Sequence, residues 1–248
     1  MGMPFYWFGI QAAIAVMSAY AVIFYDLRRR GLSTETLPDF SLFVFLTSLL
    51  GARVFFLLTN LSYFYAHPLE IFQMNKGGLI QWGGILAGIG AGALFVKIKK
   101  LSFTKYSDAV ALGLPLGFGI SRIGCLMAGC CYGRPTSMPW SIVFNNPHSL
   151  AHPLGVPLHP VQIYSSIGEF LIFGFLLLRR KKFDGELFLI YLILESFFRL
   201  VLDFFRVQIN FSHTLLLLGV GVLSCGVYIR RFFLTLNRRV ACSKFENG

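Results

Sequence analysis

Four ionisable side chains recur at helical spacing inside one apolar run, residues 185–206. Glu195, Arg199 and Asp203 stand at positions i, i+4 and i+8, so they share one face of a helix, with Arg206 close to that face. A charge at the bilayer centre costs about 2.5–3.5 kcal/mol, so such residues face a protein interior or a wet cavity. Two interpretations stay open: a self-neutralising salt-bridge ladder, or an anion site, because the donor fork of arginine matches a phosphate.

Two further arginines lie at the ends of apolar runs. Arg122 follows the run 106–121, where the chain is expected to leave the membrane, and Arg53 lies in the apolar end of the run 39–58. Few acidic residues are available to pair with Arg53, Arg122 and Arg199. We therefore expect a negatively charged guest, and a phospholipid head group is the obvious candidate.

Three cysteines, Cys125, Cys130 and Cys131, follow Arg122 closely. A cysteine beside an arginine can have a lowered pKa and act as a nucleophile. Cys125 can instead pair oxidatively with Cys130, or the three can simply pack. A metal site is not expected, because adjacent cysteines rarely place both sulfurs on one tetrahedral ion and the nearby histidines lack the usual ligand spacing.

The 248-residue chain that must position these groups is 56% hydrophobic and 13% charged, with a mean hydropathy of +0.67. A soluble globular protein is about 25% charged, so the composition excludes a water-soluble enzyme and a disordered chain. The net charge is +11, and most of the 22 basic residues flank apolar runs in four clusters, within 28–30, 97–105, 179–182 and 230–244. The positive-inside rule explains this basicity, and no nucleic-acid partner is expected.

Apolar runs of about 20 residues predict an all-α membrane protein with seven transmembrane helices. These runs cover residues 5–25, 39–58, 78–96, 106–121, 160–178, 186–205 and 213–229. Cytoplasmic basic clusters place the N-terminus outside and the C-terminus inside. Residues 1–248 then form one polytopic membrane domain, in which residues 122–159 form an extracytoplasmic head, either a cap over a cavity or a passive connecting loop.

Glycines recur every four residues at Gly84, Gly88 and Gly92. This is the spacing of small residues that lets two membrane helices approach closely. A glycine-rich phosphate loop is not supported, since no strand precedes the segment.

Several motifs resemble those of the prolipoprotein diacylglyceryl transferases, bacterial inner-membrane enzymes that move the diacylglyceryl part of phosphatidylglycerol onto the thiol of a lipobox cysteine. The matching pieces occur in family order and cover nearly the whole chain. They are WFG from Trp7, GAR from Gly51, GGLIQWGG from Gly77, SRIGCLMAGCCYGRP from Ser121, HPVQIY from His159, and the series Gly185, Tyr191, Arg199, Asp203 and Arg206.

The resemblance implies a multi-pass protein of the bacterial cytoplasmic (inner) membrane, with seven helices, a periplasmic head and a cavity open sideways to lipid. It implies phosphatidylglycerol and a lipobox prolipoprotein, or another acceptor, as partners within the membrane lipid, and neither a cofactor nor a metal. Arg122 and Arg199 look like the two arginines that engage the lipid phosphate. The other residues expected to bind substrate are Arg53, Trp82, Gly83, Gly133, Arg134, Gln162, Tyr164 and Arg206.

The chain departs from the family pattern at several polar positions. The signature usually reads GRxGNFxNGExxG, and here its Asn, Asn and Glu are replaced by Cys125, Ala128 and Cys130, while Trp82, Phe8 and Glu195 replace a His and two Tyr elsewhere.

These replacements leave three kinds of candidate for the group that takes the thiol proton: His159, Glu195, and a thiolate of Cys125, Cys130 or Cys131. The alternatives are a structural role in the head for His159 and a salt bridge to Arg199 for Glu195. Two rival functions stay open, a non-catalytic protein that binds or moves glycerophospholipid, and a thiol redox protein built on the three cysteines.

Overall fold

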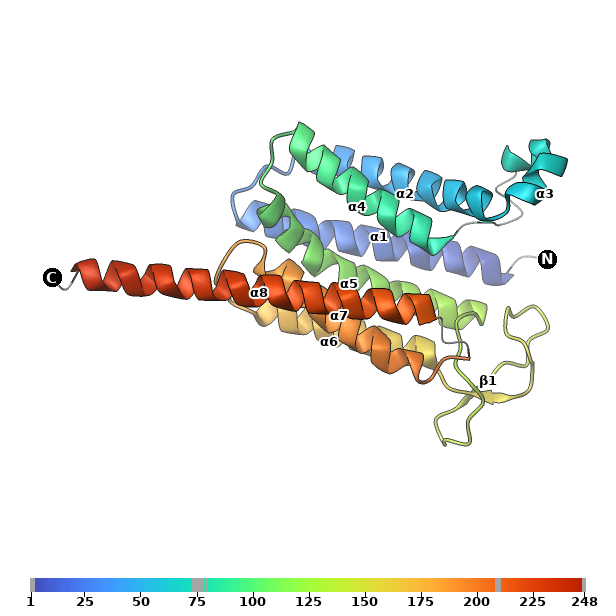
Figure 1. The fold of residues 1–248 in the computed structure, drawn as a ribbon. Helices are drawn as coiled ribbons and strands as arrows, with labels where there is room; N and C mark the ends of the chain where they lie inside the picture. Colours follow the sequence, from blue (N-terminus) through green and yellow to red (C-terminus); the bar gives the residue numbers. More distant parts are fainter. Residues whose placement is uncertain (1–2, 73–77, 79, 208–210, 247–248) are drawn as a thin grey trace. The chain divides into compact units, whose positions relative to one another are not determined.

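The computed structural model describes residues 3–72, 78, 80–207 and 211–246, and in this part the regular secondary structure is helical apart from one short two-stranded ribbon (Figure 1). The helices are α1 (Met3–Arg29), α2 (Leu37–Thr59), α3 (Leu61–Ala66), η1 (Pro68–Phe72), α4 (Gln81–Ile98), α5 (Phe103–Ala128), α6 (Val161–Leu178), α7 (Glu186–Asp203) and α8 (Phe211–Glu246). Strands β1 (Ile142–Val143) and β2 (Pro157–Leu158) pair antiparallel, with Ile142 opposite Leu158.

Five helices in the described part of the chain, α1, α2, α5, α6 and α8, are long and apolar enough to cross a bilayer. A shorter apolar helix covers Gly83–Ile98 in α4, and α7 carries four charged residues among its 18. The prediction of an all-α membrane protein is therefore confirmed. The number of seven spans and their orientation stay predictions.

Helices α5 and α8 continue farthest past their predicted ends. The prediction that the fourth run ends at residue 121 is wrong, because α5 continues to Ala128 through the apolar stretch after Arg122. Arg122 and Cys125 therefore belong to the last two turns of a helix, and the connecting loop begins only after Ala128. Helix α8 continues from its apolar part through the last basic cluster, and its 36 residues give a length of about 54 Å.

The described chain groups into two compact units, each described here by itself. In the unit Leu27–Tyr106, helices α2 and α4 lie side by side (Figure 1). A Cβ atom added at Gly88 would lie 2.4 Å from Ser48 Oγ, and one added at Gly84 would lie 3.1 Å from the Ser48 carbonyl oxygen. The predicted close approach of a glycine-lined helix face is confirmed, with α2 as its partner.

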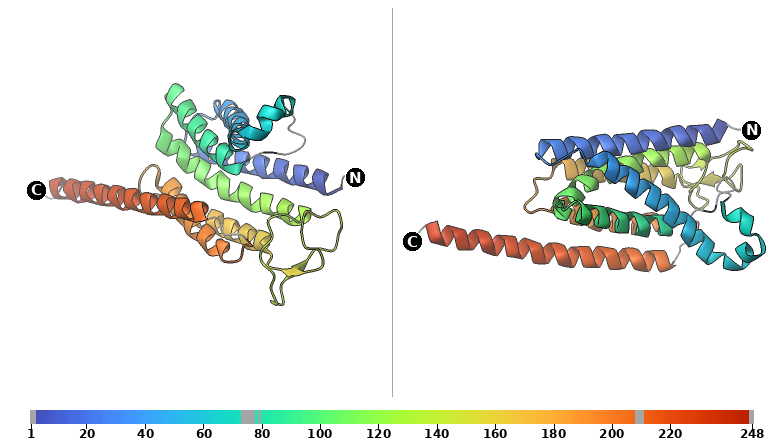
Figure 2. Two further views of the ribbon diagram at one scale, coloured as in Figure 1. Left: turned by 45° about the vertical axis from the view of Figure 1, so that its right-hand side comes forward. Right: turned by 90° about the horizontal axis from the view of Figure 1, so that it is seen from above.

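The second unit contains Met1–Asp26 and Ser107–Gly248. Helix α7 packs against both α6 and α8, and the left view of Figure 2 shows the three helices together. A Cβ atom at Gly168 of α6 would lie 2.0 Å from the Phe198 ring of α7, so these two helices meet where only glycine fits. Leu176, Leu187 and Tyr191 belong to the buried apolar core of this unit.

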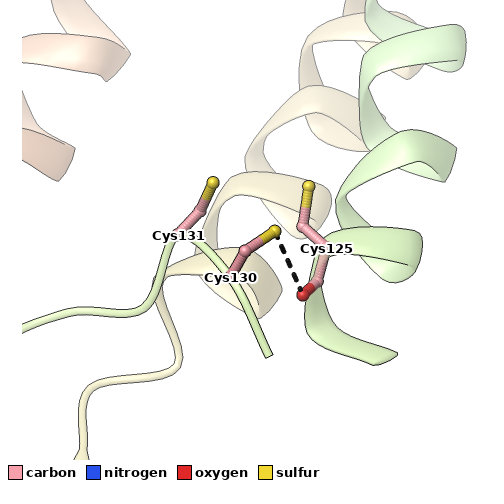
Figure 3. Close-up of side chains that lie close together, drawn as sticks. All are labelled: Cys125, Cys130 and Cys131. Carbon is pink, nitrogen blue, oxygen red and sulfur yellow. Dashed lines mark hydrogen bonds between the residues drawn. The ribbon is translucent and has the colours of Figure 1, made fainter. Parts of the chain in front are cut away.

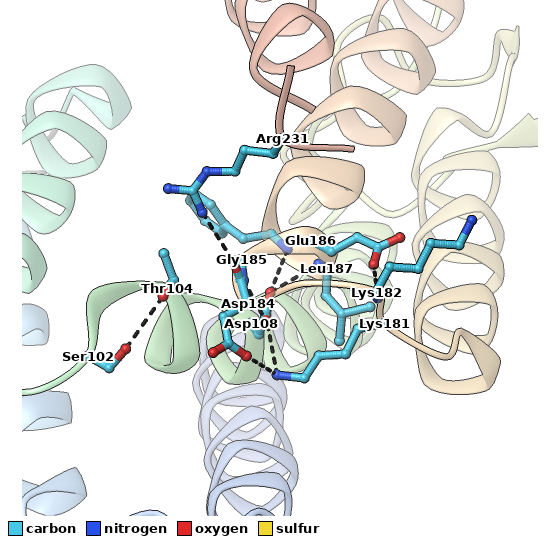
Figure 4. A network of polar contacts seen from close by, with 11 residues as sticks. Ser102, Thr104, Asp108, Lys181, Lys182, Asp184, Gly185, Glu186, Leu187 and Arg231 are labelled. Carbon is cyan, nitrogen blue, oxygen red and sulfur yellow. Dashed lines mark hydrogen bonds and ion pairs between the residues drawn. The ribbon is translucent and has the colours of Figure 1, made fainter. Parts of the chain in front are cut away.

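Asp108 of α5 caps the start of α7 (Figure 4). Its carboxylate accepts hydrogen bonds from the backbone N–H groups of Gly185 at 3.0 Å, Leu187 at 3.0 Å and Phe188 at 3.3 Å, and Lys181 Nζ lies 3.3 Å away. The first N–H groups of a helix have no partner within it and carry partial positive charge, so a carboxylate stabilises them. Asp108 is fully buried, and through this cap it fixes the helix that carries Arg199.

Candidate active site

Arg199 on α7 contacts two carboxylates. Its Nε donates a hydrogen bond to Glu195 Oε1 at 2.6 Å, and its Nη2 lies 3.7 Å from Glu169 Oε1 on α6. Arg199 is 8% exposed and Glu169 is 0% exposed. The contact expected between Glu195 and Arg199 is present. Sequence reasoning missed Glu169, although an acidic residue inside the apolar run 160–178 was a signal for it.

The carboxylates around Arg199 have oxygen atoms that can accept further hydrogen bonds. Both Glu169 oxygens and Glu195 Oε2 are buried and accept no hydrogen bond from the described residues. Buried oxygens without a donor are costly and rare. This cluster therefore offers acceptors for the donors of a guest molecule.

Arg122, in the last two turns of α5, borders a small cavity between α5 and α6. The cavity has a volume of about 130 Å³, and its lining is mostly apolar: Arg122, Ile123, Leu126, Gln162, Ile163, Ser166, Ile167 and Phe170. Arg122 Nε is buried and donates no hydrogen bond to any described residue. A permanently charged donor thus lies beside an apolar space, which is the combination that an anionic lipid needs.

Three thiols gather where α5 ends (Figure 3). The sulfur atoms of Cys125, Cys130 and Cys131 all lie within 4.8 Å of one another, and the three cysteines are free. Cys131 has a φ of 61°, a left-handed conformation that is uncommon for a residue with a side chain. This backbone turn explains how two adjacent residues direct their sulfurs to one place, contrary to our expectation for adjacent cysteines.

The three thiols differ in their affinity for protons. Hydrogen bonds from the Cys125 and Cys130 thiols, together with the positive charges of Arg122 and Arg206, hold the pKa of Cys131 far below the ordinary thiol value. Hydrogen bonds with Cys125 and Cys131, together with burial, raise the pKa of Cys130. These contacts favour ionisation of Cys131 over ionisation of Cys130.

Backbone hydrogen bonds hold the loop after the cysteines against the residues just before α6 and just after α7. Gly133 N–H donates to the His159 carbonyl oxygen at 2.9 Å, and Arg134 N–H donates to the Phe205 carbonyl oxygen at 2.9 Å. A Cβ atom at Gly133 would lie 2.4 Å from the Phe205 oxygen, so this position requires glycine. The Arg134 side chain is exposed.

A second polar cluster surrounds His159. Trp140 Nε1 donates to the Tyr164 hydroxyl at 2.6 Å, and that hydroxyl lies 3.2 Å from His159 Nδ1. The rings of His159 and Tyr164 both pack edge-on against Phe205. In the tautomer that carries its proton on Nδ1, His159 donates to the Tyr164 oxygen, and its Nε2 is free to accept a proton.

Gln162 and Arg206 connect to these clusters. Gln162 Nε2 donates to the Cys130 carbonyl oxygen at 2.7 Å, so it holds the cysteine turn against α6. Arg206 Nε lies 3.8 Å from Asp203 Oδ1, and its side chain is 28% exposed.

Arg53 belongs to the unit Leu27–Tyr106, where its guanidinium supports the backbone of a neighbouring segment. It donates hydrogen bonds of 2.8–3.2 Å to the carbonyl oxygens of Glu70, Ile71 and Gly78. The Phe56 ring stacks below it, 5.6 Å from its central carbon. These contacts give Arg53 a structural role, and its role in substrate binding stays a prediction.

Gly83 and Trp82 lie at the start of α4 in the same unit. A Cβ atom at Gly83 would lie 2.3 Å from the Gly51 carbonyl oxygen, which makes this glycine part of the α2–α4 packing. The Trp82 side chain lies outside the described part of the structure. The substrate-binding roles predicted for both residues stay predictions.

Comparisons with known proteins extend these observations. Residues 1–236 match the sequence model of the family described as prolipoprotein diacylglyceryl transferase. The phosphatidylglycerol–prolipoprotein diacylglyceryl transferase of Clostridioides difficile strain 630 is 30% identical over 239 residues, covering 93% of each chain. That of Geobacter sulfurreducens is 32% identical over 210 residues, covering 82% of this chain and 78% of the relative. The chain belongs to the prolipoprotein diacylglyceryl transferase family.

Proposed function

We propose that this protein transfers the diacylglyceryl group of phosphatidylglycerol to the cysteine thiol of a prolipoprotein at the outer face of a bacterial cytoplasmic membrane. The observation that carries the proposal is Arg122, whose buried Nε lacks a partner in the described chain and which borders an apolar cavity beside the three cysteines. The family match over residues 1–236 supports the same reaction.

The head group of phosphatidylglycerol complements the polar atoms of the site. Arg122 and Arg199 supply donors for the phosphate, and both interact electrostatically with the Glu169 carboxyl. Both Glu169 oxygens and Glu195 Oε2, which accept no hydrogen bond from the described residues, supply acceptors for the two glycerol hydroxyls. The apolar lining between α5 and α6 suits the first part of one acyl chain.

In the reaction, the acceptor sulfur forms a bond to a glycerol carbon of the lipid while the bond from that carbon to the phosphate oxygen breaks. Glycerol phosphate leaves with the electron pair, and the arginines stabilise the charge that develops on it. Glu195 already accepts a hydrogen bond from Arg199. We assign the thiol proton to His159, whose Nε2 is free in the tautomer that donates from Nδ1 to Tyr164, and a thiolate of the cysteine cluster is the alternative. Gln162, Tyr164 and the Gly133 loop position these groups.

The test is release of glycerol phosphate from phosphatidylglycerol by the purified protein in the presence of a lipobox peptide. We expect release with the wild type and its loss with Arg122→Ala and Arg199→Ala. The matched control is Arg180→Ala, because Arg180 is exposed and lies in a basic cluster away from the site. Lipid binding by the wild type without any release would contradict the proposal and favour a non-catalytic lipid-binding protein.

The proposed topology has seven spans, with the N-terminus outside and the C-terminus inside. Single cysteines in a cysteine-free background, introduced at Asn146 and at Lys99 or Lys181, test it with a membrane-impermeant thiol reagent. We expect labelling from outside only at position 146. The opposite pattern would overturn the orientation.

A further inference from the structure

The three-cysteine cluster has an arrangement that packing alone does not require. Cys125 comes from α5, whereas Cys130 and Cys131 come from the turn that follows it, yet the three sulfurs lie within 4.8 Å of one another (Figure 3). Three thiolates around one zinc ion, at a Zn–S distance of about 2.3 Å and tetrahedral angles, stand about 3.8 Å apart. The sulfurs therefore need to close by no more than about 1 Å to share one ion.

The surroundings suit a metal bound by three thiolates. A divalent cation with three thiolates carries a net charge of −1, and the positive charges of Arg122 and Arg206 act on Cys131 from nearby. Gln162 Nε2 donates to the Cys130 carbonyl oxygen at 2.7 Å, which fixes the turn that carries two of the sulfurs. Such outer contacts orient metal ligands and are as much a part of a site as the ligands themselves.

We propose that Cys125, Cys130 and Cys131 bind one thiophilic divalent cation, zinc, and that its fourth ligand position takes the acceptor thiol. Three protein ligands with one open position is the arrangement of catalytic rather than structural zinc. No carboxylate or histidine in the described part of the chain joins the three sulfurs in a cluster. A substrate can therefore fill the fourth position.

The second half of this proposal rests on the proposed function, because the acceptor is the prolipoprotein cysteine. Coordination removes the proton of a thiol, and His159 takes that proton. The metal-bound sulfur then forms its bond to the glycerol carbon, the bond from that carbon to the phosphate oxygen breaks, and glycerol phosphate leaves beside Arg122. No oxidant or reductant is needed, and the metal keeps its charge throughout.

Metal binding is tested first and without any lipid. Purified full-length protein, reduced and stripped with a chelator, is titrated with Co²⁺, whose thiolate complexes absorb by charge transfer, and Zn²⁺ is then added. We expect one equivalent of Co²⁺ to give the thiolate band and Zn²⁺ to abolish it. Cys125→Ser, Cys130→Ser and Cys131→Ser should each weaken metal binding at least about 100-fold, since loss of an outer contact alone costs about 10–100-fold.

The matched control is Cys225→Ser, because Cys225 is an exposed free cysteine on α8. Melting temperatures separate loss of the site from loss of the fold: Zn²⁺ should raise the melting temperature of the wild type and of Cys225→Ser, but not that of the three cluster variants. Absence of a thiolate band in the wild type, or its persistence in all three cluster variants, would overturn the site. A Cys125–Cys130 disulfide in protein trapped directly from cells would overturn it too.

The open position is tested with a lipobox peptide and its Cys→Ser counterpart. The cysteine peptide should add a further thiolate band to the Co²⁺ protein and the serine peptide should not, and identical spectra would refute the acceptor role. Neither measurement requires turnover, so a metal site that takes the peptide but shows no transfer would refute the proposed function and leave the site standing. Full transfer by metal-free protein would refute the catalytic role of the metal.

Discussion

Replacement of Arg122 by lysine separates phosphate recognition from simple charge balance. The guanidinium fork offers two charge-assisted hydrogen bonds to a phosphate, whereas lysine keeps the charge as a point donor. Loss of one charge-assisted bond costs about 1.5–3 kcal/mol. We therefore expect Arg122→Lys to raise the Kd for phosphatidylglycerol about 10- to 150-fold. The free energy of unfolding should change little, because Arg122 Nε donates no hydrogen bond within the described chain.

The assay titrates the purified variants in detergent with phosphatidylglycerol and measures their thermal unfolding in parallel. Arg180→Lys is the matched control, because Arg180 is exposed and outside the site. A Kd for Arg122→Lys within about twofold of the wild-type value, less than 0.5 kcal/mol, would refute the reasoning. Arg122 would then serve only to balance the charge of neighbouring acids.

Three further predictions follow from other parts of the molecule. Asp108→Ala removes the cap of α7 and should lower the free energy of unfolding by about 2–4 kcal/mol. Asp184→Ala, at a carboxylate that is 43% exposed, should leave this free energy nearly unchanged, and equal effects of the two variants would contradict the capping role. Because the pKa of Cys131 lies far below the ordinary value, its alkylation rate in metal-free protein should be flat between about pH 5 and 8, whereas that of a free thiol such as glutathione rises with pH. Parallel profiles for Cys131 and glutathione would refute the lowered pKa. Gly133→Ala forces a Cβ atom against the Phe205 carbonyl and should lower the free energy of unfolding by about 1–3 kcal/mol. Gly226→Ala, at a position with open space, should not. An unchanged melting temperature of Gly133→Ala would show that the loop shifts to accommodate the methyl group.

The helices were predictable from the sequence because long apolar runs can satisfy their backbone in lipid only as helices. Glycine spacing also predicted a close helix contact, and it occurs between α4 and α2. The predicted run ended at residue 121, too early for α5, because the charged Arg122 follows it. A membrane helix can nevertheless carry an arginine near its end when the side chain reaches a polar partner or cavity. The cap by Asp108 could not be predicted, since it joins residues 77 or more positions apart in sequence.

The site was predicted in part. The spacing of Glu195 and Arg199 predicted their contact because both positions follow from helical geometry alone. Glu169 was missed because its partner lies on a different helix, and only the packing at Gly168 brings the two together. The close approach of the three thiols was missed because it depends on the left-handed backbone conformation of Cys131. The residue types in this segment do not predict that conformation.

The most direct test of the central claim is the mass of a lipobox peptide after incubation with the purified protein and phosphatidylglycerol. The peptide should gain one diacylglyceryl group on its cysteine sulfur, a Cys→Ser peptide should gain none, and Arg122→Ala should abolish the gain while it keeps the melting temperature of the wild type. An unmodified cysteine peptide, recovered with folded wild-type protein that has bound the lipid, would contradict the account.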